Sequence, residues 1–72
     1  MPEIELLSEV ALLRDLPEHG LVRGQVGTVV ETLADGAVEV EFSDDHGRTY
    51  ALPAVRLEDL VRLHRGPLEQ VA

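Results

Sequence analysis

The clearest pattern in the chain is a strict alternation of apolar and polar residues over residues 37–43. Val38, Val40 and Phe42 occupy every second position, and Glu39 and Glu41 stand between them. Successive side chains of a β-strand point to opposite faces of its sheet, so this period of two predicts an extended strand. We expect the three apolar residues to face the core and the two glutamates to face water.

Shorter apolar runs predict four further strands. They cover residues 9–13, 27–33, 48–52 and 61–64, and residues 57–60 have the composition of one short helical turn. Each strand has only one apolar face to bury, which favours a sheet that closes on itself. The fold class is therefore all-β, a small five-stranded SH3-like barrel with a short helical turn before the last strand. A small open sheet with a terminal helix is the alternative.

Glycine and aspartate mark the turns between these strands. Asp35 and Gly36 form a hairpin signal, because this pair readily adopts the positive φ angles of short β-turns. Gly47 is expected at the left-handed position of a second hairpin turn. Gly24 and Gly27, three residues apart, suggest a tight turn that enters the second strand.

Length and composition limit the chain to one small domain. It has 72 residues, no cysteine, 44% hydrophobic residues and one residue each of phenylalanine and tyrosine, so valine and leucine must build the core. The expected parts are an N-terminal extension (1–8), the barrel domain (9–64) and a flexible C-terminal tail (65–72).

The formal net charge of -8 narrows the classes of partner. A phosphate backbone is bound by clustered Lys and Arg, so the excess of acidic residues argues against a nucleic-acid partner and favours a basic protein as the partner. The acidic start MPEIELL lacks the basic segment of a secretory signal, and no apolar run approaches the roughly 20 residues of a membrane span. We expect a cytoplasmic protein that does not engage a membrane, and the oligomeric state stays open.

Four segments together resemble the small bacterial family of domain of unknown function 4926. These are residues 10–17, 21–31, 38–42 and 45–52, and the string RGQVGTVV within the second is specific by itself. The resemblance covers about residues 4 to 64. It implies a small stand-alone protein with no assigned reaction or ligand, often encoded in arrangements similar to toxin–antitoxin or immunity pairs. The Gly-x-x-Gly-x-Val core is also similar to KOW and nitrile-hydratase-like branches of the SH3-like barrels.

The candidate partner-binding surface is acidic and centres on the alternating strand. Glu39 and Glu41 lie about 7 Å apart on one side of it, and Glu31 on the preceding strand is expected near them. Asp44 and Asp45 lie at the following turn. Such a patch could dock a basic surface and steer its approach. The alternative is that these positions are merely solvated.

A second candidate cluster follows in the returning strand, where Arg48 and Tyr50 are residue types favoured at interfaces. The alternative places Tyr50 in the core or at the barrel rim. Arg14 and Asp15 are expected to form a local ion pair.

The sequence indicates neither an enzyme nor a cofactor or metal site. His19, His46 and His64 sit in three different segments without the close spacing of metal ligands. No serine or threonine lies in a nucleophile motif. Backbone amides at the Gly24 turn could receive an anion, but the Lys and the following helix of a phosphate loop are missing.

The leading hypothesis is thus a protein-binding module, antitoxin- or immunity-like, that acts as the acidic partner of a basic protein. One alternative is a KOW-like nucleic-acid or ribosome-associated module that uses Arg56, Arg62 and Arg65 near the C-terminus, with Arg48 adjacent to them in the fold. Another is an accessory subunit of an enzyme, which would dock through Leu13, Val29 and Leu33 if they lie outside the core.

Overall fold

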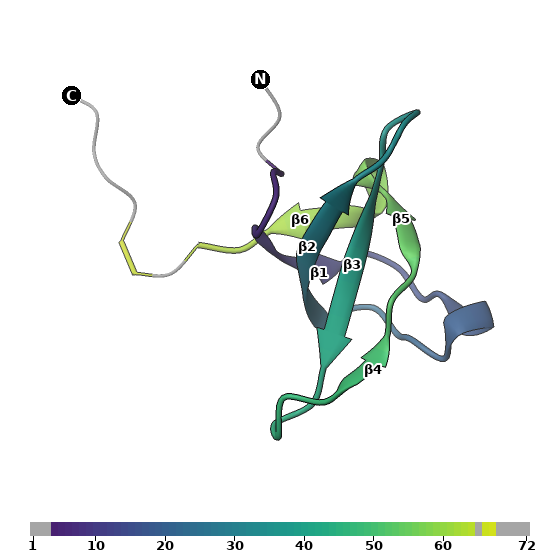
Figure 1. Cartoon of the computed structure of the whole chain (residues 1–72), viewed down its shortest axis with the longest axis vertical. Coiled ribbons are helices and arrows are strands. Elements are labelled where there is room, and N and C mark those ends of the chain that lie inside the picture. The colour runs from purple at the N-terminus through teal and green to yellow at the C-terminus, as the bar shows by residue number, and fades with distance from the viewer. Residues whose placement is uncertain (1–3, 65, 68–72) are drawn as a thin grey trace.

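The computed structural model describes residues 4–64, 66 and 67. Within them the chain forms six strands and two short 3₁₀ helices, and none of its helices is long and apolar enough to cross a membrane. In chain order the elements are β1 (Glu9–Leu12), η1 (Pro17–His19), β2 (Val26–Thr32), β3 (Ala37–Ser43), β4 (Thr49–Ala51), β5 (Ala54–Arg56), η2 (Leu57–Asp59) and β6 (Leu60–Arg62) (Figure 1). The predicted all-β class is confirmed, as is a helical turn directly before the last strand.

All strands pair antiparallel in the order β4-β3-β2-β1-β6, and β5 also pairs with β3. β4 and β5 share β3 end to end, because β4 pairs with Phe42 and Ser43 whereas β5 pairs with residues 37–39. Between them, the Val40 N–H donates to the Pro53 carbonyl at 3.0 Å. The predicted fourth strand is observed as β4 and ends before Pro53, whereas β5 beyond the proline was not predicted. Proline lacks a backbone donor, but its carbonyl still accepts a hydrogen bond from β3.

The pairing leaves the sheet open at one side. Figure 1 shows the long β2–β3 hairpin crossing in front of β1 and β6. Among the described residues no ladder joins β6 to β4 or β5. The strands follow the meander expected of a barrel, and their hydrogen bonds stop short of closing it.

The core lies on the inner face of the sheet, where Val38, Val40 and Phe42 are buried as the alternation predicts. β1 contributes Val10 and Leu12 to the same cluster. The remaining buried apolar residues are Leu16, Leu21, Val29, Val55 and Leu60. Aliphatic side chains thus surround the single phenylalanine, as the composition requires.

Gly27 is not a turn residue, and the prediction that placed it in a turn is wrong. It lies inside β2, paired with Val10 of β1. A Cβ atom there would lie 2.6 Å from Val40 Cγ1 and 2.8 Å from the Glu41 carbonyl oxygen. Glycine is required because β3 approaches closely, whereas Gly24 supplies the turn itself with a φ of 95°.

The described part of the predicted N-terminal extension lies along β2. The Leu7 N–H donates to the Val29 carbonyl at 2.7 Å, and the Val29 N–H donates to the Ser8 carbonyl at 2.9 Å. Ser8 is buried, and its Oγ accepts from the Glu5 N–H at 2.9 Å. Leu7 and Ser8 are thus tied to β2 by backbone hydrogen bonds, and Glu5 is tied to Ser8. Of the predicted tail, only Gly66 and Pro67 lie within the described residues.

Candidate protein-binding surface

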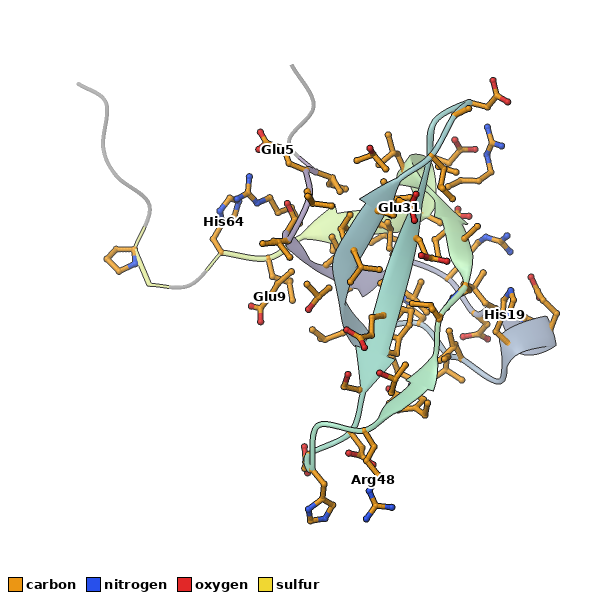
Figure 2. The ribbon with its side chains drawn as sticks, in the orientation of Figure 1. Glu5, Glu9, His19, Glu31, Arg48 and His64 are labelled. Atoms are coloured by element: carbon orange, nitrogen blue, oxygen red, sulfur yellow. The ribbon has the colours of Figure 1, made fainter. Side chains whose placement is uncertain are left out.

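The β2–β3 hairpin brings three of the predicted glutamates to one face. Glu31 pairs directly with Glu39, and Glu41 pairs with Thr28, with a register shift after Val29. Paired residues of antiparallel strands project to the same side, so all three carboxylates lie on the face opposite the core. Glu31 is exposed, and Glu39 and Glu41 are half-buried. Figure 2 shows Glu31 on the hairpin.

The Glu31–Glu39 pair sets two like charges directly opposite each other. Such a pair destabilises a sheet by roughly 0.2–1 kcal/mol. Within the part of the chain that the structure describes, neither carboxylate has an ion pair or a side-chain hydrogen bond. Glu41 differs, because its carboxylate accepts a hydrogen bond from the Thr49 hydroxyl on β4. The pair is therefore an uncompensated charge cluster in an otherwise regular hairpin.

The second hairpin uses Asp44 to build its turn. The Asp44 carboxylate accepts from the His46 N–H at 2.8 Å and from the Arg48 N–H at 3.0 Å. Gly47 closes the turn with a φ of 79°. Asp45 and Arg48 are exposed at this end of the molecule, where Figure 2 labels Arg48. Asp44 is thus committed to the backbone, whereas Asp45 and Arg48 present their charges to solvent.

Asp44→Ala is expected to lower the free energy of unfolding by about 1–2 kcal/mol, because two backbone donors lose their acceptor at an exposed turn. Asp45→Ala, one residue away, is the matched control and is expected to change stability by less than about 0.5 kcal/mol. Urea denaturation of both variants checks this. Equal losses would show that the turn does not depend on the Asp44 carboxylate.

Tyr50 lies away from the acidic hairpin pair, against the loop that precedes β2. Its hydroxyl accepts from Gln25 Nε2 at 3.1 Å, while Gln25 Oε1 accepts from the Val22 N–H at 2.7 Å. The Tyr50 ring is half-exposed, with its centroid 6.4 Å from that of Phe42. Tyr50 therefore joins β4 to the loop, and the candidate residues do not all form one cluster.

The arginines are held by partners that the sequence did not predict. Arg14 Nε lies 3.0 Å from Asp59 Oδ2, and this hydrogen-bonded ion pair raises the pKa of Arg14. Asp15 instead accepts from the Arg23 N–H at 2.8 Å, so the predicted Arg14–Asp15 pair is wrong. The segment that joins β1 to β2 is thus held at two places. Arg14 binds Asp59 of η2, and the Arg23 N–H binds Asp15 within the segment itself.

Of the arginines named for the KOW-like alternative, Arg56 pairs with Glu58 at 3.3 Å and Arg62 is half-buried on β6. Arg65 lies outside the described residues. Arg48 lies at the turn between β3 and β4, at the bottom of the view in Figure 2. These side chains are spread over different elements.

An apolar row on the outer face was missed by sequence reasoning. Ala11 of β1 pairs with Val26 of β2 on one side and with Val61 of β6 on the other, and the two valines are 47% and 42% exposed. Leu13, two residues beyond Ala11, is 48% exposed. Of the residues named for apolar docking on condition that they lie outside the core, Leu13 and Leu33 meet the condition, whereas Val29 is fully buried and does not.

The three histidines lie in separate places. His19 ends η1, His46 is in the β3–β4 turn and His64 follows β6, and Figure 2 shows His19 and His64 on opposite sides of the sheet. In the described residues, no three side chains of His, Asp or Glu gather in a way that could hold a metal ion.

The fold and its outer face define a small all-β domain with an open antiparallel sheet and an acidic and apolar outer surface. Residues 6–62 match the family described as domain of unknown function DUF4926. The match spans most of the chain, and the protein belongs to this family. No curated protein and no solved structure matches the chain.

Proposed function

We propose that this chain is a non-catalytic, cytoplasmic protein-binding module whose acidic outer hairpin face docks a basic partner protein. The observation that carries the proposal is the Glu31–Glu39 pair, in which two carboxylates oppose each other without a counter-charge among the described residues. A lysine at either position would serve the fold better. A cationic partner side chain would neutralise both carboxylates and convert their repulsion into binding energy.

The overall charge supports the same partner chemistry. A net charge of -8 on 72 residues attracts a basic surface over several ångströms and accelerates the encounter, with strong dependence on salt. An antitoxin- or immunity-like role, which the family resemblance implies, would use an acidic protein in this way. The module would act by covering its partner, with Asp45 and Arg48 at the hairpin end as peripheral contacts.

Glu39→Lys is expected to stabilise the isolated protein, because it replaces the repulsion across the hairpin by an attraction to Glu31. The free energy of unfolding should rise by roughly 0.2–1 kcal/mol at low salt, and the gain should shrink at high salt. Urea denaturation at two salt concentrations measures it. The double variant Glu31→Lys/Glu39→Lys restores a like-charge pair and should lose the gain.

The same variant should weaken partner binding although it strengthens the fold. Tagged wild-type protein, Glu39→Lys and the control Glu18→Lys, which makes the same charge change on η1, would be compared as baits in the source cells. We expect a basic protein that is enriched by wild type and Glu18→Lys, released by salt and lost with Glu39→Lys. A partner that binds Glu39→Lys with unchanged affinity at every salt concentration would refute the proposed function.

A further inference from the structure

We propose that the partner element is a cationic amphipathic helix that lies across the outer face of β2, β1 and β6. Its apolar side covers the row formed by Val26, Ala11 and Val61, and its basic side faces the carboxylates of the β2–β3 hairpin. This inference rests on the proposed function, because it names the part of the basic partner that the module would bind.

The apolar row is continuous across three strands. The pairings of Ala11 with Val26 and with Val61 place the three side chains side by side on the face opposite Val10 and Leu12. Neighbouring strands lie about 4.8 Å apart, so the row is about 10 Å long. Two of its members are β-branched residues that are more than 40% exposed. Aliphatic residues exposed singly are ordinary, whereas these three side chains are contiguous across three strands.

The acidic residues flank this row on the same face. Thr28 lies two residues beyond Val26 on β2, and it pairs with Glu41 of β3 and with Glu9 of β1. Positions two residues apart on a strand are about 7 Å apart, so this row runs parallel to the apolar one at that distance. The Glu31–Glu39 pair lies further along the hairpin. The outer face therefore has an apolar strip with carboxylates along one side.

A helix matches these two spacings. Its diameter with side chains is about 10–12 Å, so an apolar stripe that rests on the valines places flanking Lys or Arg side chains above the neighbouring carboxylates. Proteins that bind an amphipathic helix contact the apolar side chains that recur with the period of the helix. A second copy of this chain fits poorly, because it would bring another surface of net charge -8 against the same carboxylates.

The test uses a fluorescein-labelled helical peptide of about 18 residues, made of Leu and Lys in an amphipathic pattern, with anisotropy as the readout. Wild-type protein is expected to bind it, and Val26→Thr/Val61→Thr should bind about tenfold more weakly, since two buried methyl groups are lost. Threonine keeps the preference for strands, so the fold should persist, and circular dichroism verifies it. The single variants should each show part of the loss, and Val22→Thr, 56% exposed in the loop before β2, should show none.

A peptide of the same composition with its Leu and Lys positions scrambled separates this inference from the proposed function. If both peptides bound equally and the threonine double variant had no effect, the inference of an amphipathic helix would be overturned. The proposed binding of a basic partner to the acidic face would be retained. Weaker binding by the threonine variant together with unchanged binding by Glu39→Lys at low salt would support the apolar row and refute the acidic hairpin. Loss with both variants supports the two together.

Discussion

Phe42→Ala is expected to leave the protein largely unfolded. Phe42 is the largest fully buried side chain of the core, one residue before the end of β3. Truncating a buried phenylalanine costs about 3–5 kcal/mol, and a domain of this size has a total stability near the lower end of the usual range of about 5–15 kcal/mol. Thermal unfolding followed by circular dichroism measures the loss.

Two further variants serve as comparisons for the loss of stability caused by Phe42→Ala. Phe42→Leu keeps most of the buried volume and should cost clearly less than the alanine variant. Tyr50→Ala removes the other ring of the aromatic pair, which is half-exposed on β4, and should also cost less. If Phe42→Ala were no more destabilising than Tyr50→Ala, the assignment of Phe42 to the centre of the core would be wrong.

Gly27→Ala is expected to lower the free energy of unfolding by about 3 kcal/mol, at the upper end of the usual cost of overpacking. The added Cβ would meet the Val40 side chain and the Glu41 carbonyl oxygen, both closer than 3 Å. The carbonyl belongs to the β3 backbone, so relief requires the two strands to separate. Urea denaturation of the variant measures the loss.

Gly24→Ala is the matched control, because it makes the same change three residues earlier in open space. It should cost only about 1 kcal/mol, from the positive φ at that position. Adding Val40→Ala removes one of the two clashes at Gly27, so Gly27→Ala/Val40→Ala should cost less than the sum of the single variants. Strict additivity, with equal costs at both glycines, would contradict a close approach of β3.

The sequence predicted those elements whose pattern is local. Alternation over residues 37–43 identified β3 and its buried face, because polar residues marked every second position. β5 was missed because it has three residues with one buried side chain, Val55, and it follows a proline. The role of Gly27 was missed for a different reason: a glycine that permits a turn and one that permits close packing look the same until the partner strand is known.

The candidate surface was predicted in part. The placement of Glu31 near the β3 glutamates followed from hairpin logic, whereas its direct opposition to Glu39 depends on the register shift after Val29. The apolar row was not predicted, because the segment Val10–Leu13 is apolar throughout and gives no sign of which residues face outward. The Arg14–Asp59 ion pair joins segments that are distant in sequence, and no local pattern encodes it.

The most direct test of the account is a map of backbone amide chemical shifts of the ¹⁵N-labelled protein during titration with the amphipathic Leu/Lys peptide. The largest changes are expected on the outer sheet face, at Val26, Thr28, Glu39 and Val61. Changes concentrated instead on the loop and edge strand around Val22, Tyr50 and Leu52, with the outer face unaffected, would contradict it.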